Sequence, residues 1–325
     1  MSNHILVTGA AGFIGSHLCE RLLERGDTLV GLDNFNDFYD PSIKRGHAAL
    51  LEKHSGFRMV EGDIRDETLL AKLFAAESFD SVIHLAAMAG VRPSLEQPAH
   101  YHDVNCTGTT RLLEAARVAG VTRFIFGSSS SVYGGNERVP FREDDDVSGP
   151  VSPYAATKRG NELTCFTFHH LYKMDIACLR FFTVYGPRQR PEMAIHKFVR
   201  MLHEGEPLPC FGDGSSERDY TYVHDILDGI VKAHDKTQGY RIYNLGESDT
   251  ISLRDLVAAI GKATGIEPQV DWQDMQPGDV PRTYADVTRA KQELGYDPRV
   301  NIHEGLERFV AWYRGPEGPG GGSAS

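Results

Sequence analysis

Short apolar runs alternate with segments of helical periodicity over the first 180 residues. The runs lie at residues 5–8, 28–33, 57–61, 81–85 and 123–127. Between them Asp66 is placed to cap a helix that runs through Ala76, and residues 103–119 also have a helical pattern. Strands and helices that alternate in this way form right-handed crossovers. We therefore predict an α/β fold with a doubly wound parallel sheet of the Rossmann type, whose ligands bind beyond the carboxyl ends of the strands.

The alternation loosens after Val184, where Pro187, Pro191, Pro207 and Pro209 mark irregular connections. Later helices are predicted to start near residues 225, 252, 288 and 301, the last with a capping box completed by residue 304. We assign residues 1–180 to the sheet domain, with returning segments near 215–250, and residues 181–314 mainly to a smaller C-terminal α/β substrate domain. Residues 315–325 are rich in Gly, Pro and Ser and are predicted to be a disordered tail or a vector remnant.

The first apolar run ends in three glycines spaced three residues apart. Gly9 permits a tight exit from the strand, Gly12 lets the main chain approach a pyrophosphate, and Gly15 lets the following helix lie close to the sheet. The pyrophosphate would bind the free N–H groups at the positive end of that helix. The second run ends in Asp33, whose carboxylate can accept both hydroxyls of an adenosine ribose and would repel a 2′-phosphate. This context predicts a dinucleotide site that prefers NAD over NADP.

The polar and aromatic loop at residues 34–41 is expected at the adenosine half of this site, and Asp63 is placed to meet the adenine. Small residues at 86–90 follow the fourth strand and leave room for a cofactor. His84 lies within that apolar strand, and such a histidine is more often a hydrogen-bonded core group than a catalytic one. We therefore assign no chemistry to His84.

Composition narrows the possible partners. The net charge of -11 argues against general nucleic-acid binding, so an anionic ligand would need a local concentration of arginines. The five cysteines are far apart and lack CxxC spacing, which suggests reduced thiols and no metal site. No apolar run approaches the roughly 20 residues that cross a bilayer. We expect a cytoplasmic protein without a membrane partner.

Tyr154 and Lys158 lie four residues apart at the start of a predicted helix, so both side chains project from one face. A phenol with a pKa near 10 that acts as a base at neutral pH needs this pKa lowered by roughly 3 units, or about 4 kcal/mol. A nearby ammonium together with an oxidised nicotinamide could supply that. Such a pair is common on helix surfaces, but the serine run at residues 128–131 ends the fifth strand and would face the same crevice.

The glycine turn, Asp33, the serine run and the Tyr154/Lys158 pair together resemble the extended short-chain dehydrogenase/reductase superfamily over residues 4–314. Within it the chain is similar to nucleotide-sugar 4-epimerases. The resemblance implies that Tyr154 is the catalytic base, that Lys158 binds the nicotinamide ribose and lowers the pKa of Tyr154, and that Ser129 bonds the 4-oxygen of the sugar. It implies NAD as cofactor, bound by Gly9, Gly12, Phe13, Ile14, Gly15, Asp33, Asn34, Asp63, Ile64, Leu85, Ala86, Ala87, Tyr154 and Lys158.

The serine run also separates branches of this superfamily. Sugar-nucleotide 4,6-dehydratases resemble the chain but carry an Asp-Glu pair where Ser130 and Ser131 stand, and UDP-xylose-forming decarboxylases carry Glu in place of Ser131. Elimination and decarboxylation need an extra proton donor or acceptor, so hydroxyl groups alone favour an epimerase.

Residues 33–41, 89–94 and 180–191 resemble the UDP-glucuronate 4-epimerases. The UDP-glucose enzymes usually carry lysine where Ala89 stands and asparagine where Thr183 stands. The resemblance implies that Arg190, Thr183 and the serine run hold the sugar carboxylate. The implied substrate-binding residues are Arg92, Ser129, Ser130, Ser131, Thr183, Arg190, Arg218, Asp279 and Arg282.

Within that set, Arg218 is expected at the diphosphate, Asp279 at a ribose hydroxyl, and Arg282 as a second cation. Guanidinium suits phosphate because its planar donors match the oxygens in pairs. UDP-glucose epimerases usually have an arginine where Gln276 stands, which leaves the neutralisation of the diphosphate open.

The predicted reaction is NAD-dependent, reversible C4 epimerisation of UDP-glucuronate to UDP-galacturonate through a 4-keto sugar. The alternatives are UDP-glucose/UDP-galactose epimerisation, another NAD-dependent conversion of a sugar nucleotide, and a non-catalytic NAD-binding sensor. Apolar residues on several faces of the helices near residues 103 and 154, among them Leu112, Leu113, Leu163 and Phe166, together with the resemblance, predict a homodimer.

Overall fold

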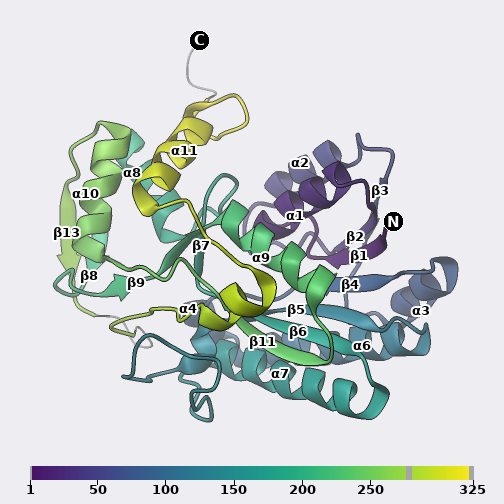
Figure 1. Ribbon diagram of the computed structural model, residues 1–325. Coiled ribbons are helices and arrows are strands. Elements are labelled where there is room, and N and C mark those ends of the chain that lie inside the picture. Colours follow the sequence, from purple (N-terminus) through teal and green to yellow (C-terminus); the bar gives the residue numbers. More distant parts are fainter. Residues whose placement is uncertain (1, 276–279, 322–325) are drawn as a thin grey trace.

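A seven-stranded parallel sheet forms the centre of the computed structural model, which describes residues 2–275 and 280–321. Its strand order is β11-β6-β5-β4-β1-β2-β3 (Figure 1). The strands are β1 (His4–Thr8), β2 (Thr28–Asp33), β3 (Phe57–Glu61), β4 (Ser81–His84), β5 (Arg123–Ser129), β6 (Asp175–Phe181) and β11 (Tyr240–Leu245). Each neighbouring pair is parallel. The predicted doubly wound Rossmann sheet is confirmed.

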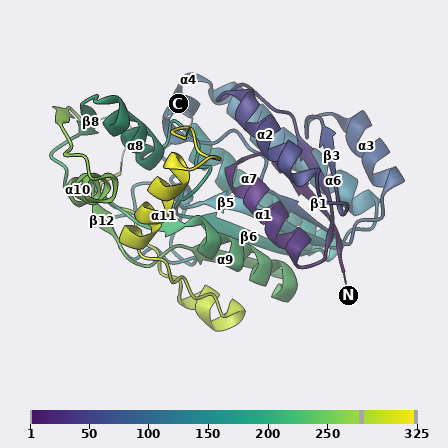
Figure 2. The same ribbon diagram turned by 90° about the horizontal axis from the view of Figure 1, so that it is seen from above.

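Helices cover both faces of this sheet, as Figures 1 and 2 show. One face carries α1 (Phe13–Glu24), α2 (Pro41–Leu51) and α9 (Val223–Lys236), and the other carries α3 (Glu67–Ala76), α6 (Gly108–Val118) and α7 (Pro153–Tyr172). Alternate residues of β1 point to opposite faces: Ile5 and Val7 join one core cluster and Leu6 joins another. Because both faces are buried, the strands are continuous apolar runs rather than alternating ones.

The C-terminal elements gather at one end of the molecule, on the left in Figure 1. Two-stranded pairs form between β7 and β10, β8 and β13, and β9 and β12, and α8, α10 and α11 pack beside them. The bounds are β7 (Thr183–Tyr185), α8 (Ala194–Glu204), β8 (Leu208–Phe211), β9 (Glu217–Arg218), β10 (Tyr220–Tyr222), β12 (Ile251–Ser252), α10 (Leu253–Thr264), β13 (Val270–Gln273) and α11 (Ile302–Arg314). The remaining helices are α4 (Val91–Glu96), α5 (Pro98–His102), two π-helical turns (Asp103–Thr107 and Ala290–Leu294) and a 3₁₀ turn (Ser130–Tyr133).

Side-chain caps fix the starts of several helices. Ser152 caps α7, which has Pro153 at its first position, and the Asp66 carboxylate accepts a hydrogen bond from the third residue of α3, as predicted. Asn301 caps α11 through its side-chain oxygen. The capping box predicted there is not completed, because the Glu304 carboxylate pairs with Arg308 one turn later instead.

Other predicted boundaries shift by a few residues. The fifth strand extends to Ser129, two residues further than predicted, and the helix predicted from residue 103 begins with a π-helical turn. The helix predicted to start near residue 288 begins there with two helical residues, which continue into the short π-helical turn at Ala290–Leu294. Residues 315–321 form turns bonded back to the end of α11, and residues 322–325 lie outside the described part of the chain. The domain division at residue 180 and the disordered tail stay predictions.

Candidate active site

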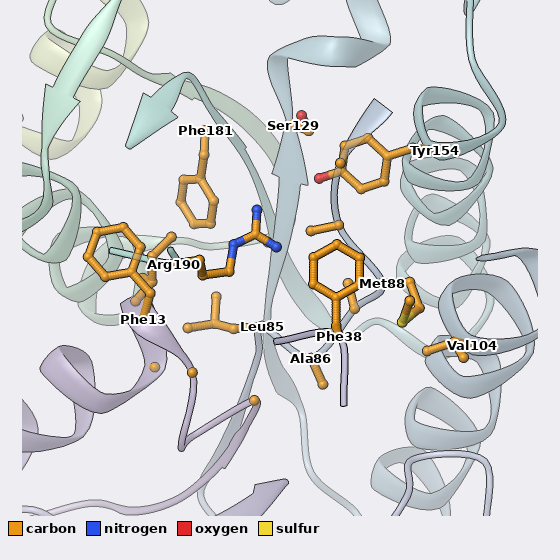
Figure 3. A pocket seen from close by; sticks show the side chains of 18 of the residues that line it. Phe13, Phe38, Leu85, Ala86, Met88, Val104, Ser129, Tyr154, Phe181 and Arg190 are labelled. Carbon is orange, nitrogen blue, oxygen red and sulfur yellow. The ribbon is translucent and has the colours of Figure 1, made fainter. Parts of the chain in front are cut away.

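A cavity of about 440 Å³ lies where the carboxyl ends of β1, β2, β4 and β5 meet the loop after β7. Figure 3 shows side chains from several of these elements turned toward it. Most of the predicted site residues line it: Gly9, Gly12, Phe13, Ile14, Gly15, Asp33, Asn34, Asp63, Ile64, Leu85, Ala86, Ala87, Ser129, Ser130, Ser131, Tyr154, Lys158, Thr183 and Arg190. Residues far apart in the sequence thus share one space.

The glycine turn between β1 and α1 forms one end of the cavity. Gly9 has φ +70°, and a Cβ there would lie 2.8 Å from the Ala86 nitrogen. A Cβ on Gly15 would lie 2.0 Å from the Gly9 carbonyl oxygen, so any larger residue would push α1 away from the turn. Gly12, the N-cap of α1, offers no side-chain oxygen, which leaves the first N–H groups of the helix available to an anion. The turn fits a pyrophosphate.

Asp33 ends β2 beside this turn. Its Oδ2 accepts a hydrogen bond from the Ala11 N–H at 3.1 Å and its Oδ1 accepts one from the Phe35 N–H at 2.9 Å. Burial raises the pKa of the Asp33 carboxyl, and those two N–H groups oppose the rise. Asn34 donates to Asp63, whose pKa is lowered to about 2, chiefly by hydrogen bonds from Arg65. These contacts fix the cavity wall where β2 and β3 end.

Tyr154 and Lys158 approach the cavity from the first two turns of α7. The Lys158 ammonium is buried and donates a hydrogen bond of 2.6 Å to the carbonyl oxygen of Gly127 in β5. Burial lowers the pKa of Lys158 to about 8. Burial raises the pKa of Tyr154; the groups that oppose the rise are Ser129, by hydrogen bonding, and the charge of Arg190. The lowered pKa expected from the sequence requires an oxidised nicotinamide as well as Lys158, and it stays a prediction.

The serine run turns at the end of β5. The Ser129 hydroxyl accepts a hydrogen bond from the Ser131 N–H and donates one to the Ser131 hydroxyl at 3.1 Å. Ser128 is buried and donates to the Glu162 carboxylate, which also pairs with the buried Arg180 of β6 at 2.8 Å. This network joins β5, β6 and α7 directly beneath the cavity, so the serines and Tyr154 are held in a fixed relation.

Arg190 enters the cavity from the loop after β7. Its guanidinium and the Tyr154 hydroxyl point toward one another, with the Phe38 ring beside them (Figure 3). The guanidinium carbon lies 5.5 Å from the centroid of the Phe38 ring, and Nε lies 3.2 Å from the carboxylate of Glu192. Thr183, on β7, lines the same region. The Arg190 guanidinium beside the hydroxyl groups of Tyr154 and Thr183 suits a substrate that carries both a hydroxyl group to deprotonate and a negative charge.

A second cavity of about 300 Å³ is lined by residues of α4, α8, β8 and β10. It contains the predicted residues Arg92 and Arg218, together with Lys197. The Arg92 guanidinium stacks on the Phe211 ring at 4.7 Å, and Arg218 donates to the Glu217 carbonyl oxygen at 2.8 Å. Cations next to an aromatic ring suit a nucleotide with a phosphate group and a flat base.

One predicted substrate residue, Arg282, is not among the residues that line this cavity. Arg282 pairs with the Glu217 carboxylate at 2.7 Å and lies near Thr250. Asp279, like Gln276, lies outside the described residues.

Comparison with known proteins agrees with this geometry. The family model described as GDP-mannose 4,6 dehydratase matches residues 6–309. A protein of Thermodesulfobacterium geofontis named UDP-glucuronate 4-epimerase is 43% identical, over 95% of each chain. The chain belongs to the UDP-glucuronate 4-epimerase family of extended short-chain dehydrogenases/reductases.

Solved structures of related enzymes have the same architecture. UDP-glucuronic acid 4-epimerase from Bacillus cereus, in complex with UDP-glucuronic acid and NAD, has a TM-score of 0.89 and 38% identity, and the alignment covers 96% of this chain and 99% of that one. UDP-glucose 4-epimerase from Thermotoga maritima, with UDP-glucose, has a TM-score of 0.88 and 32% identity, with 96% and 98% covered. The neutral-sugar enzyme thus shares the fold at a lower identity.

Several cavity residues were not predicted. Phe38 and Lys44 line the cavity, and Phe38 packs in one cluster with Met88 and Tyr154. The placement of its loop at the adenosine half stays a prediction. The three aromatic residues of this loop indicated that it packs against another part of the chain. Only the fold shows which part that is. Glu192, the ion-pair partner of Arg190, is two residues away in sequence and could have been found by its charge.

His84 is a core residue, as expected. Its ring nitrogens bond Thr8 and Thr109 hydroxyls at 2.6 and 2.9 Å, and burial lowers its pKa to about 3. In residues 2–275 and 280–321, no group of His, Cys, Asp and Glu is arranged to hold a metal ion. Within the same ranges, no helix has the length and apolar character needed to span a membrane.

Proposed function

We propose that this protein catalyses the NAD-dependent, reversible epimerisation of UDP-glucuronate to UDP-galacturonate at C4. The observation that carries the proposal is the meeting of the Tyr154 hydroxyl, Ser129 and the Arg190 guanidinium in one cavity that also contains the glycine turn. Relatives named UDP-glucuronate 4-epimerase at 43% identity support the choice of substrate.

The residues at the glycine turn fit NAD. The free N–H groups of Phe13 and Ile14 would hold the pyrophosphate, and Asp33 would accept the adenosine ribose hydroxyls. Lys158, buried beneath Tyr154, would donate to the nicotinamide ribose. NAD+ held at this turn would supply the hydride chemistry, which is reversible oxidation at C4 of the sugar. The oxidised form also carries a positive charge, which would lower the pKa of Tyr154 from the raised value that burial gives it.

Tyr154 serves as the proton acceptor for the 4-hydroxyl and returns that proton after the ring has turned over. Ser129 donates a hydrogen bond to the same oxygen and holds it within reach of the phenol. Both groups are poised by the caps and networks beneath them: Ser152 at the start of α7 and the buried pair of Glu162 with Arg180. A group held in place in this way needs little reorganisation during proton transfer.

Arg190 and Thr183 bind the sugar carboxylate, with help from the serine run. Oxidation at C4 makes the sugar a β-keto acid, which tends to lose carbon dioxide. The protein must therefore restrain the carboxylate while the ring turns. A guanidinium that binds the two carboxylate oxygens in a fixed plane can keep the breaking C–C bond out of line with the carbonyl π system.

The nucleotide half of the substrate occupies the second cavity. Arg218 and Arg92 neutralise the diphosphate there, and the Phe211 segment receives the base. Arg282 and Asp279 complete the site in this proposal, as second cation and ribose acceptor. Reorientation of the sugar about its phosphate linkage needs the UDP to stay bound, and a separate cavity for it allows the hexose alone to turn.

We further infer a homodimer formed through α6 and α7. Leu163 and Phe166 of α7 are 52% and 48% exposed on one face of that helix. Leu112 and Leu113, also expected there, are instead fully buried against the sheet, so they do not contribute. We also infer a cytoplasmic location, which the five unpaired cysteines favour.

The test is a product assay with purified protein. Ligand released from the denatured protein is identified by mass spectrometry, and UDP-glucuronate and UDP-glucose are then offered separately. The proposal expects co-purified NAD, UDP-galacturonate from the first sugar and little or no UDP-galactose from the second. The control is Tyr154→Phe, which keeps the ring but removes the base; unchanged turnover in that variant would contradict the assigned chemistry.

A further inference from the structure

Arg190 is carried on a short loop between β7 and α8 whose backbone is fixed from several sides. Gly186 has φ 142° and Arg188 has φ 63°, a left-handed conformation that is rare for arginine. The buried Gln189 side chain donates to the Val184 carbonyl oxygen at 3.0 Å and accepts from the His196 N–H at 3.2 Å. These bonds tie the loop to β7 and α8, on the C-terminal side.

Two further bonds tie the same loop to α1, the helix that begins at the glycine turn. His17 of α1 bonds the Pro187 carbonyl oxygen at 2.9 Å, and Arg188 donates from Nη2 to the Glu20 carboxylate at 2.9 Å. Arg188 is largely buried, and its Nη1 has no hydrogen-bond partner among residues 2–275 and 280–321. A buried arginine that leaves one nitrogen unpaired, in an uncommon backbone conformation, is costly to maintain. The ion pair with the Glu20 carboxylate offsets this cost.

The left-handed residue also sets the direction of the next side chains. Arg188 turns toward α1, and Arg190, two residues later, turns into the cavity toward Tyr154 (Figure 3). The loop therefore links the helix at the dinucleotide turn to the guanidinium at the reacting end. A shift of the loop relative to α1 would move Arg190 relative to Tyr154.

We propose that Arg188 is a positioning residue: its ion pair with Glu20 fixes the loop on α1 so that Arg190 holds the sugar carboxylate away from the geometry of decarboxylation. This inference rests on the proposed function and adds a specificity role outside the cavity, since Arg188 does not line it. With the loop free to move, Arg190 would bind the carboxylate less rigidly. Epimerisation would continue, but more of the 4-keto sugar would be lost.

The loss has a defined chemistry. In the 4-keto acid the C5–C6 bond breaks, its electron pair forms the C4–C5 enolate, and C6 leaves as carbon dioxide. C5 then takes a proton from water, which gives a UDP-4-keto-pentose. The ratio of pentose to epimer therefore reports how well the carboxylate is restrained, and a general loss of stability does not change that ratio.

The experiment compares Arg188→Met, Arg188→Lys and Glu20→Gln with the unaltered protein, using UDP-glucuronate labelled with ¹³C at C6. Labelled carbon dioxide and UDP-sugars are measured by mass spectrometry. We expect the pentose-to-epimer ratio to rise by about tenfold in Arg188→Met, because a tenfold change corresponds to the loss of one charge-assisted hydrogen bond. The rise should be smaller in Arg188→Lys. Glu20→Gln should raise it in the same direction.

Arg21→Met is the matched control. Arg21 is adjacent to Glu20 on α1, but it pairs with Asp228 of α9 at 3.4 Å and leaves the Arg190 loop untouched. Its product ratio should equal that of the unaltered protein. An unaltered ratio in a folded Arg188→Met variant, or an equal rise in Arg21→Met, would overturn the assignment.

A binding measurement separates this inference from the proposed function. In the Tyr154→Phe background, calorimetry gives the preference for UDP-glucuronate over UDP-glucose without turnover. We expect Arg188→Met to reduce that preference by about tenfold, with UDP-glucose affinity unchanged. This result does not depend on epimerase activity: inactivity of the unaltered protein would count against the function, whereas an unchanged preference in Arg188→Met would count against the role of Arg188.

Discussion

The Nε atom of Arg190 lies 3.2 Å from the carboxylate of Glu192, two residues further along the same loop. A sugar carboxylate that binds Arg190 must therefore compete with a carboxylate that the chain itself supplies. The pair is partly exposed, so it is worth no more than about 1 kcal/mol. This weak pairing can hold the guanidinium near the Phe38 ring and still release it to a substrate.

The first prediction concerns this competition. Glu192→Gln should lower KM for UDP-glucuronate by about threefold, the equivalent of a weak exposed ion pair, and leave kcat nearly unchanged. Steady-state kinetics at low and high salt check it, because the difference should shrink as salt screens the charges. A raised KM would mean that Glu192 helps to place Arg190 rather than competing for it.

The second prediction is a shift in pH dependence. Tyr154 acts as a base when deprotonated, so activity rises with pH through its pKa. Burial raises that pKa, and the hydrogen bond from Ser129 lowers it. Ser129→Ala removes a group that stabilises the phenolate, so the pKa rises and the ascending limb of the kcat profile moves to higher pH. Profiles from pH 6 to 10 for both proteins check this.

The control for the second prediction is Ser131→Ala. Ser131 belongs to the same run, but it is not among the groups that shift the pKa of Tyr154. Its profile should keep the position of the unaltered protein, although its rate can fall. A matching shift in both variants would show that the serine turn as a whole, rather than the Ser129 hydroxyl, sets the pKa.

The third prediction tests the glycine turn. In Gly15→Ala the added Cβ would lie 2.0 Å from the Gly9 carbonyl oxygen, so α1 must move and the N–H groups at its start move with it. We expect loss of co-purified NAD and a destabilisation of about 1–3 kcal/mol. Released nucleotide is measured by absorbance and chromatography, and stability by denaturant titration with NAD removed.

Gly46→Ala provides the matched control for Gly15→Ala. Gly46 lies within α2, and a Cβ there has nothing within 4 Å. Alanine should stabilise the helix by about 0.5–1 kcal/mol and leave NAD content unchanged. Retained NAD in Gly15→Ala would contradict the assignment of the turn to the pyrophosphate.

The sequence predicted the sheet because its signals are local. A strand buried on both faces is a continuous apolar run, and the glycines of the turn are fixed by contacts within and next to their own crossover, such as Gly15 against Gly9. The cavity follows from the topology, since parallel strands that end at one edge bring Asp33, Ser129 and Tyr154 together. These three were found without knowledge of any side-chain contact.

The contacts and the pKa shift that could not be predicted from the sequence depend on packing between distant segments. Nothing near Phe38 indicates that it reaches Tyr154, and nothing near Arg188 indicates Glu20, which is 168 residues away. The rise that burial gives the pKa of Tyr154 has the same origin, because burial is a property of the fold and the spacing to Lys158 does not reveal it. Leu112 and Leu113 were placed on an interface for a similar reason: helical spacing alone does not say which apolar face meets the sheet.

The last prediction concerns the exposed face of α7. If two copies pair there, a charge at Phe166 would be buried in the interface without a partner, and Phe166→Glu should dissociate the dimer by weakening it about 100-fold or more. Multi-angle light scattering across a range of concentrations gives the mass.

Trp272→Glu is the control, since Trp272 is a similarly exposed aromatic residue (41%) on β13, away from this face. The same charge there should leave the mass unchanged. The fold of Phe166→Glu should persist, because Phe166 is half-exposed and contributes little to the core. A mass of one chain for the unaltered protein at all concentrations would contradict the dimer, whereas a mass of two chains in both variants would move the interface to another face.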